Sequence, residues 1–400
     1  MTSSSDRSER PLSRALTLLA PTVAIVVAAE FIVVGLLPVV AQDLSIPLAR
    51  AGGMAGWFAF SAAVAGPIVT LSARRLTPRF ILTGTLLLYA ACNLLVATVS
   101  DFSLMLLARM VQGATLPAFI SVGASVVMEL APMAERGNGL SRANIGFVLG
   151  VLLALPAGFA LARCGTWRLP FVVLAATSML LAPLIAMRFP SIPAGRNEGL
   201  GGPLAIVRQP VFVAHLGLSV VLFAAMFSAY TYLGAWVEQA LGLSTWGVAV
   251  ALLLFGLFGL LGNSIAGRVA DIAPMRATMV AVVVLVASVN LTALAGHAIL
   301  LAAAPLVLWS ASHTASVALG QVRVTLAGQS AASFAMTLNI SAANLGIAIG
   351  AAGGGRVIDS QGISAIGIAP FGFAILSLPI VSFIRRSTSR GISRLPLTGA

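Results

Sequence analysis

The sequence predicts an all-α polytopic membrane protein in which 12 transmembrane helices form two pseudo-symmetric six-helix bundles. Of its 400 residues, 59% are hydrophobic and only 8% are charged, whereas soluble domains carry about 25% charged residues. Twelve apolar runs are long enough to cross the hydrocarbon core of a bilayer, which takes about 20 residues. A polar segment at 188–210 divides these runs into two sets of six, and short sequences repeat between the two sets.

The 12 apolar runs give the expected order of elements. The predicted helices span 15–40, 52–72, 80–99, 102–128, 138–162, 167–187, 211–236, 245–266, 277–296, 298–320, 330–354 and 364–384. The predicted domains are an N-terminal tail at 1–14, an N-terminal bundle at 15–187, a linker at 188–210, a C-terminal bundle at 211–384 and a C-terminal tail at 385–400. Pro, Gly and Arg are concentrated in the linker, as is typical of a connecting segment.

The arginines predict the orientation of the chain. All 23 basic residues are Arg, and if the N-terminus is cytoplasmic only Arg50, Arg163, Arg168 and Arg356 fall outside, while Arg109 falls within a helix. The remaining 18 fall on the cytoplasmic side: Arg7, Arg10, Arg14, Arg74, Arg75, Arg79, Arg136, Arg142, Arg188, Arg196, Arg208, Arg268, Arg276, Arg323, Arg385, Arg386, Arg390 and Arg394. An excess of Arg in cytoplasmic loops sets orientation, so we expect both termini in the cytoplasm.

Composition and motifs also exclude several classes of protein. The net charge of +12 comes from residues placed between apolar runs instead of on one face, so we expect no nucleic acid partner. Cys92 and Cys164 have neither disulfide nor metal-site spacing. The chain contains neither His-Glu-x-x-His nor Gly-x-Ser-x-Gly, and without Lys it cannot contain a Gly-x-x-x-x-Gly-Lys-Ser/Thr phosphate loop. We therefore expect no enzyme, no ATP-driven pump, no cofactor and no metal.

An internal repeat supports the division into two halves. The segment from Gly66 to Arg79 is similar to the segment from Asn263 to Arg276, an offset of 197 residues. Two repeated bundles are the architecture of alternating-access carriers, whose substrate site lies near mid-bilayer between the halves. The alternative is a chance similarity of two short Arg-rich turns.

Glu30 is an acid near the middle of the first apolar run. An ionised side chain at the bilayer centre costs about 2.5–3.5 kcal/mol on insertion scales, and intramembrane acids mark functional sites by default. We therefore expect Glu30 to face a cavity, a partner charge or a proton. The alternative is a protonated, hydrogen-bonded Glu with a structural role.

Five segments, spread over nearly the whole chain, carry recognisable motifs. They are Glu30-Phe-Ile-Val-Val-Gly-Leu-Leu-Pro38, the loop from Gly66 to Arg79, Ala108-Arg-Met-Val-Gln-Gly113, the run from Gly146 through Pro156-Ala-Gly158 to Trp167-Arg168, and Leu338-Asn-Ile-Ser-Ala-Ala-Asn-Leu-Gly346. Together they resemble the major facilitator superfamily, in the drug:proton antiporter branch that includes arabinose, nucleoside and chloramphenicol efflux permeases. The second and third are similar to its Gly-x-x-x-Asp-Arg and Arg-x-x-Gln-Gly signatures.

The resemblance implies a monomeric carrier of the bacterial inner membrane, which exports a small organic solute such as a drug, sugar or nucleoside against inward proton flow. The family links a Gly/Pro pattern like that of Gly146, Gly150, Pro156 and Gly158 to antiport, although Leu155 stands where Gly is expected. Small residues also let helices approach closely, and Pro permits a bend. The alternative function is a proton-coupled importer with the same fold.

The loop signature departs from the family pattern. The candidate conformational loop residues are Arg74, Arg75, Arg79, Arg268 and Asp271. The family's loop acid, which helps to latch the outward-facing state, is replaced by Ala73 and Arg74 in the first half, whereas Asp271 occupies the corresponding turn in the second half. The alternative is that these arginines only fix the topology.

Glu30 and Arg109 are the candidate proton-coupling pair. At 1.5 Å rise per residue both lie roughly 12–20 Å below the outer surface, so they can meet at similar depth. A guanidinium within about 4–6 Å favours the ionised carboxylate, whereas apolar burial favours the protonated acid. The alternatives are a static ion pair and an Arg109 bonded to backbone. Gln112, one turn from Arg109, contacts substrate or joins two helices.

Three helix faces are candidates for the wall of the substrate cavity. They are Trp309, Ser312, His313 and Ser316; Phe223, Phe227 and Tyr230; and Thr337, Ser341 and Asn344. Helical spacing places each set on one face. Each set has an alternative role. The Trp309 set could form an interhelical contact, and the Asn344 set could form interhelical hydrogen bonds. The Phe227 set could belong to an aromatic belt at the membrane interface, as could Trp236 in particular.

Overall fold

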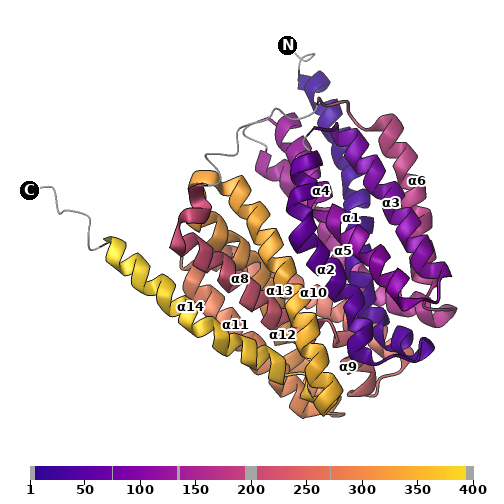
Figure 1. Cartoon of the computed structure of the whole chain (residues 1–400), viewed down its shortest axis with the longest axis vertical. Coiled ribbons are helices and arrows are strands. Elements are labelled where there is room, and N and C mark those ends of the chain that lie inside the picture. Colours follow the sequence, from indigo (N-terminus) through magenta and orange to yellow (C-terminus); the bar gives the residue numbers. More distant parts are fainter. Residues whose placement is uncertain (1–4, 74, 133–135, 194–204, 271, 393–400) are drawn as a thin grey trace, which may run out of the picture.

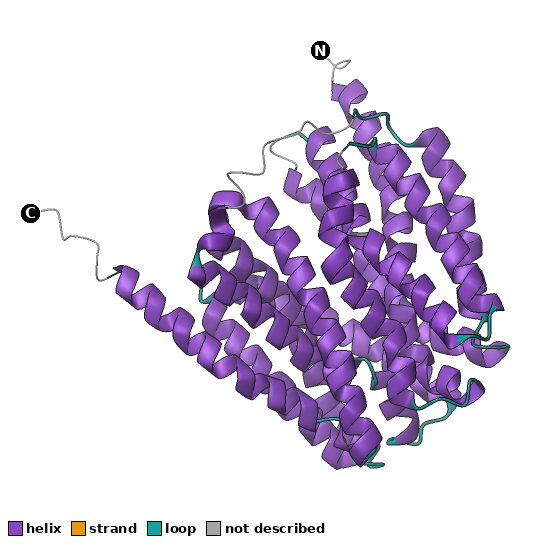
Figure 2. Ribbon diagram, in the orientation of Figure 1, coloured by secondary structure: helices purple, strands orange, loops and turns teal. Residues whose placement is uncertain are grey.

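The structure is a computed structural model that describes residues 5–73, 75–132, 136–193, 205–270 and 272–392 (Figure 1). Long helices make up nearly all of the described chain, and no strand occurs in those ranges (Figure 2). The N-terminal half comprises α1 (Ser5–Asp43), α2 (Leu48–Ala73), α3 (Pro78–Thr98), α4 (Phe102–Leu130), α5 (Arg136–Cys164) and α6 (Leu169–Arg188). The C-terminal half comprises α8 (Pro210–Tyr230), α9 (Leu233–Gln239), α10 (Thr245–Ala270), α11 (Pro274–Ala295), α12 (Ile299–Ala327), α13 (Ala332–Gln361) and α14 (Ile368–Ile392).

The predicted number of membrane spans is confirmed. The described residues contain 12 helices long and apolar enough to cross a membrane, with α8 and α9 together forming one of them. Large apolar side chains such as Leu180 and Val283 are exposed on the outside of the bundle, at 68% each. Such surfaces would be unstable in water, and they suit contact with lipid.

The seventh span differs from the expectation of one helix over 211–236, because the chain turns at Thr231 and Tyr232 between α8 and α9. The Tyr232 hydroxyl, which is buried, donates a hydrogen bond to the Ala351 carbonyl of α13 over 2.8 Å. In α9, Gly234 lies so close to the Val34 carbonyl of α1 that a Cβ could not be added without a shift. The break thus lets α9 pack directly across α1.

The tenth span also differs from its predicted range. The helix expected at 298–320 continues to Ala327, so Arg323 lies within α12 and not in a cytoplasmic loop. Its side chain is 2% exposed. The predicted helix end at residue 320 was therefore wrong, because the charge of Arg323 does not reveal that the helix continues past it.

The two halves repeat the same pattern of helix crossings. In the N-terminal half α5 crosses α1 at Gly146, where a Cβ would collide with the Ala20 carbonyl. In the C-terminal half α13 crosses α8 at Gly354, where a Cβ would collide with the Ser228 carbonyl. The pairs α2 with α4 and α10 with α12 match in the same way. Small residues at such crossings allow the close backbone contact that holds helices together in lipid.

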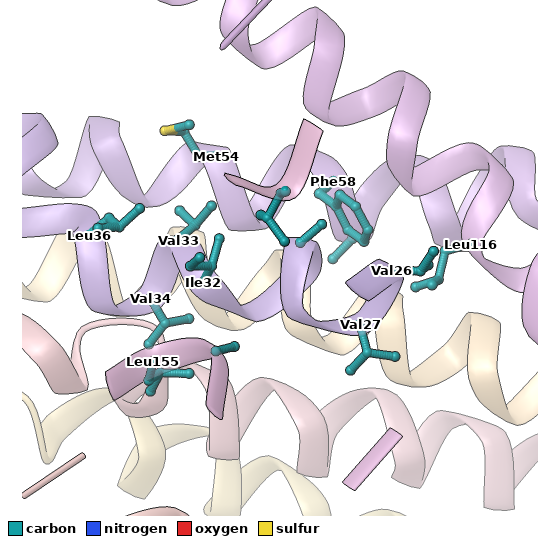
Figure 3. Close-up of a cluster of buried hydrophobic side chains, with 14 of the residues drawn as sticks. Val26, Val27, Ile32, Val33, Val34, Leu36, Met54, Phe58, Leu116 and Leu155 are labelled. Carbon is teal, nitrogen blue, oxygen red and sulfur yellow. The ribbon is translucent and has the colours of Figure 1, made fainter. Parts of the chain in front are cut away.

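The first helix, α1, lies in the packed interior of the N-terminal half. Val26, Val33 and Val34 are at most 2% exposed. Figure 3 shows Val26 beside Leu116 of α4, while Val34 points towards Leu155 of α5 on another side of the helix. Contacts on several faces fix the rotation of α1 and, with it, the direction in which Glu30 points.

The halves meet chiefly where α2 packs on α13 and α5 packs on α10. At the α9 end, which lies away from both termini in Figure 1, Arg163 of α5 forms an ion pair with Glu238 of α9. At the same end Gly52 of α2 lies against the Tyr232 ring. These contacts join the halves at the α9 end, beside a cavity of about 480 Å³ whose lining includes Gln42 of α1 and Glu238 of α9.

Candidate functional site

Glu30 faces a small cavity between the two halves. The cavity has a volume of about 10 Å³, and its lining includes Glu30 and Phe31 of α1, Phe58 of α2, and Phe227 and Thr231 at the end of α8. This is about the space that one water molecule requires. The cavity is therefore too small to hold an organic solute in this conformation.

Arg109 of α4 is fully buried beside Glu30, and backbone carbonyls bind its guanidinium. Nη1 donates to the Ala29 carbonyl over 2.7 Å, Nη2 to the Glu30 carbonyl over 3.0 Å, and Nε to the Met54 carbonyl of α2 over 3.2 Å. Its Cζ lies 4.5 Å from the centroid of the Phe58 ring, a cation–π contact. Arg109 thus joins α4 to α1 and α2.

The structure brings Glu30 and Arg109 together without a direct ion pair between their side chains. The ion pairs between described residues include Arg163–Glu238 and Arg168–Asp43, but none joins the side chains of Glu30 and Arg109. The alternative of an Arg109 bonded to backbone therefore describes this conformation. Because the guanidinium binds the Glu30 carbonyl itself, its charge still lies next to the residue that carries the acid.

Gln112 lies in the same network and joins helices within the N-terminal half. Its Nε2 donates to Oδ1 of Asn93 in α3 over 3.0 Å, and its Oε1 accepts a hydrogen bond from Arg109 Nη1 over 3.0 Å. Its backbone carbonyl accepts a hydrogen bond from the Tyr89 hydroxyl. Both Oε1 and Nε2 of the Gln112 side chain are therefore hydrogen-bonded within the protein. This agrees with the alternative that Gln112 joins two helices.

The C-terminal half supplies an aromatic cluster next to the cavity. The rings of Tyr230 and His313 stack with centroids 4.5 Å apart, and Phe227 lies 5.3 Å from His313. Phe255 of α10 lies 5.8 Å from Tyr230 and meets Trp309 edge-to-face at 5.5 Å. The predicted residues Phe227, Tyr230, Trp309 and His313 therefore come together, and Phe255 completes the cluster.

Phe31 connects this cluster to the N-terminal half. Its ring centroid lies 6.4 Å from those of both Phe227 and Tyr230. Phe31 directly follows Glu30 in α1, and both residues line the small cavity. The candidate acid and the aromatic contact between the halves are thus neighbours in the chain.

The other predicted cavity residues are buried but differ in their bonding. The Ser312 hydroxyl donates to the Leu308 carbonyl of its own helix over 2.7 Å, so it is satisfied locally. Asn344 Nδ2 donates to the Ile340 carbonyl in α13, while its Oδ1 is buried without a partner. Trp236 is fully buried, which contradicts the interfacial belt alternative at that position.

The glycines of the Gly/Pro motif, which lie in the helix predicted at 138–162, pack against α1. Gly146, Gly150 and Gly158 approach Ala20, Ala24 and Ile32, respectively. Pro156 lies within α5 directly after Leu155, whose carbonyl lies close to Gly35 of α1. The motif therefore sets the distance between α5 and the helix that carries Glu30.

The three candidate loop residues that the structure describes, Arg75, Arg79 and Arg268, differ in their surroundings. Arg79 donates a hydrogen bond to the Phe189 carbonyl at the end of α6, whereas Arg75 and Arg268 are exposed. Arg74 and Asp271 lie outside the described residues. The described contacts hold Arg79 to α6 within its own half.

Sequence reasoning missed a second buried arginine network in the C-terminal half. Arg323 Nη1 donates to the His215 carbonyl of α8 over 2.9 Å and lies 2.9 Å from His215 Nδ1. Arg323 Nη2 donates to Ser219 Oγ over 2.9 Å, and Ser219 donates to Oδ1 of Asn339 in α13 over 2.8 Å. His215 and Ser219, one turn apart in an apolar run, were the available signal.

The Major Facilitator Superfamily matches residues 19–351, and the chain belongs to this family of transporters. Inner membrane transport protein YdhP of Escherichia coli (strain K12) is 26% identical over 334 residues, which cover 83% of this chain and 85% of the relative. A probable sugar efflux transporter of Mannheimia succiniciproducens is 26% identical over 357 residues, covering 89% and 88%. The chloramphenicol resistance protein of Streptomyces lividans is 30% identical over 273 residues, covering 66% and 69%.

Solved structures confirm the fold. A bacterial homologue of the human lysosomal transporter Spinster, in an inward-facing and unoccupied conformation, has a TM-score of 0.77 at 15% identity, covering 94% of this chain and 97% of that one. Nucleoside transporter NupG has a TM-score of 0.75 at 13% identity, covering 94% and 99%. The protein is a multi-pass membrane transporter, and the predicted location in a bacterial inner membrane agrees with the description of the Escherichia coli relative.

Proposed function

We propose that this transporter exports a small organic solute in exchange for protons, and that Glu30 carries the proton. The observation that supports this proposal is the position of Glu30 at a cavity lined by both halves. The surroundings of an acid in that position change whenever the halves move relative to each other. The energy of the proton gradient can then act on the movement itself.

Arg109 gives the protonation change its direction. We expect closure of the halves to expel water from around the acid, and loss of water disfavours a charged carboxylate. When the halves separate, water hydrates the carboxylate and the fixed Arg109 charge stabilises its ionised form. The guanidinium itself stays in place because three backbone carbonyls bind it. Proton release is thereby linked to opening.

The direction of transport rests on the crossing of α5 with α1 and on the relatives. The Gly146, Gly150 and Gly158 contacts place the Gly/Pro motif on the helix that carries Glu30. Two of the relatives are called a sugar efflux transporter and a chloramphenicol resistance protein. Both names indicate removal of a solute from the cell, so export is the direction that we propose.

The orientation, domain boundaries and oligomeric state belong to the same proposal. We infer from the arginine distribution that both termini are cytoplasmic, so that the α9 end faces outward. The linker between the halves is proposed at 188–210. A carrier whose site lies between its own two halves is complete in one chain, so we propose a monomer.

Replacing Glu30 by Gln tests the proposal, because Gln resembles the protonated acid but releases no proton. Wild-type protein, E30Q and the control E129Q, a change at an exposed acid of α4, would be expressed in a host lacking its own efflux pumps. Growth inhibition and efflux would be measured for chloramphenicol, adenosine and isopropyl thiogalactoside, with and without a proton uncoupler. We expect E30Q to lose uncoupler-sensitive efflux at normal membrane levels, while E129Q retains it.

Two results would contradict this assignment. Efflux by E30Q that equals wild-type efflux would remove Glu30 from proton coupling. In sealed vesicles of known orientation, labelled solute moving with the protons would identify an importer.

A further inference from the structure

We propose that the aromatic cluster of the C-terminal half binds an uncharged solute that carries a flat aromatic ring and a hydrogen-bond acceptor. The cluster is called the aromatic cage below and consists of Phe227, Tyr230, Phe255, Trp309 and His313. This inference rests on the proposed function in one respect only, namely that the solute binds between the two halves. It names the chemical class of that solute.

The arrangement of rings favours a flat aromatic partner. Tyr230 and His313 already stack, with an interplanar angle of 29°, and Phe223 stacks on Phe227 at 8°. Aromatic pairs prefer such offset-stacked or edge-to-face contacts. Phe31 covers Phe227 and Tyr230 from the opposite half. When the halves separate, Phe31 leaves with the N-terminal half and exposes ring faces onto which a solute ring can stack.

Unpaired polar atoms show where the solute would form hydrogen bonds. Trp309 Nε1, His313 Nδ1 and Thr231 Oγ1 are buried and have no hydrogen-bond partner. Trp309 and Thr231 are 0% exposed, and His313 is 7% exposed. Most buried polar groups in proteins are paired, so unpaired atoms on two residues of the cage and on Thr231, the neighbour of Tyr230 in the chain, call for an explanation. The indole N–H can only donate, and it therefore requires an acceptor on the solute.

The buried charges argue against an ionised solute. Glu30 is the acid at the cavity, and the fixed Arg109 guanidinium lies beside it, so protonation of Glu30 leaves a net positive charge that repels a cation. The described helices of the C-terminal half bury another cation, Arg323, without a carboxylate partner. An anion is disfavoured too, because ring faces are electron-rich. An uncharged ring compound avoids both penalties.

The cage is also a poor site for a sugar. A sugar presents hydroxyl groups in every direction, and burying them without partners is unfavourable. The Ser312 and Ser316 hydroxyls, which could have served them, donate to carbonyls of their own helix. The walls left beside the cavity are largely rings and aliphatic side chains, as in Phe58 and Ile347. These surroundings favour a ring with few polar groups.

Equilibrium binding to the purified full-length protein in lipid nanodiscs tests the proposal. The probes are chloramphenicol and adenosine as uncharged ring compounds, tetraphenylphosphonium as an aromatic cation, and isopropyl thiogalactoside as a sugar. We expect at least one uncharged ring compound to bind, with affinity at least tenfold above that of the cation and the sugar. Because no gradient is applied, loss of proton coupling would leave this result unchanged.

Two matched tryptophan variants locate the site. Trp309→Phe keeps a ring but removes the N–H, and we expect it to weaken binding about tenfold, the effect of one hydrogen bond. Trp236→Phe is the control, because Trp236 Nε1 is equally buried and unpaired but lies outside the cage. It should bind like wild type. Thr231→Val removes another unpaired polar atom, Thr231 Oγ1. It tests the same prediction if W309F aggregates in size-exclusion chromatography.

Three outcomes would overturn the proposal. The first is that neither chloramphenicol nor adenosine binds. The second is that tetraphenylphosphonium or isopropyl thiogalactoside binds as tightly as they do. The third is that folded W309F and T231V both bind like wild type. In each case the E30Q efflux experiment would still report independently on proton coupling.

Discussion

Among the residues whose burial the structure describes, each half buries one arginine, and the two have different surroundings. Arg109 in α4 lies beside Glu30 and binds carbonyls of α1 and α2. Arg323 in α12 binds His215 and Ser219 of α8. An amide extends each network, Asn93 through Gln112 in the first and Asn339 through Ser219 in the second. The two networks are built alike, but only the Arg109 network has an acid, Glu30, beside its arginine.

This difference indicates which arginine takes part in proton handling. The charge of Arg109 adjoins an acid at the boundary between the halves, where movement changes exposure to water. Arg323 contacts α8 and, through Ser219, α13, which all belong to one half and move together. A buried charge can serve as a switch only where its environment has two states. We therefore expect Arg109 to matter for transport and Arg323 mainly for packing.

The largest expected effect follows from Arg109→Met. This change removes three bonds to backbone and leaves Glu30 without the neighbouring charge, so we expect proton-driven efflux to be abolished. Stability should fall by about 3 kcal/mol, since charged hydrogen bonds contribute about 1.5–3 kcal/mol each and are not additive. Melting in detergent and uncoupler-sensitive efflux measure the two effects. Arg109→Lys, which keeps the charge but not the fork of donors, should recover stability only in part.

A smaller effect is expected for Arg323→Met. A buried cation replaced by an apolar side chain of similar length can be neutral in stability, so we expect a loss of at most about 1–2 kcal/mol. Efflux should stay within about twofold of wild type because no acid depends on Arg323. The same melting and efflux assays apply. Abolished efflux in a protein that melts normally would show that the C-terminal network also couples to transport.

The smallest effects are expected for the two amides. Asn93→Leu and Asn339→Leu each remove one acceptor from a buried donor, which should cost about 1 kcal/mol in each half. Only N93L should also reduce efflux, because Gln112 Nε2 loses its partner and Arg109 loses a fixed neighbour. Equal efflux from the two variants would mean that the networks do not differ in function.

Much of the fold could be predicted from the sequence because the bilayer imposes simple lengths. Twelve apolar runs gave 12 spans, and the family followed from motifs such as the one around Arg109. The break at Thr231 and the continuation of α12 past Arg323 were not predictable. Both depend on contacts with other helices, at Ala351 and His215, that lie more than 100 residues away in the chain.

The candidate site was predictable in its members but not in their bonding. Glu30, Arg109 and the stripe of Trp309 and His313 stand out because polar groups in apolar runs are rare. Their partners do not stand out, since carbonyls of α1 leave no mark in a sequence. Phe255, one apolar residue among many in its run, could be assigned to the cage only once α10 was placed beside α12.

By itself, the sequence determined that this chain crosses a membrane in 12 spans and belongs to a family of transporters, because hydrophobic length and short motifs are local properties. Only the tertiary structure decided that Arg109 binds the backbone around Glu30, that Arg323 is buried and that rings from three helices form one cage. Those outcomes depend on how helices cross, and the crossings are set by glycines whose partners lie on other helices.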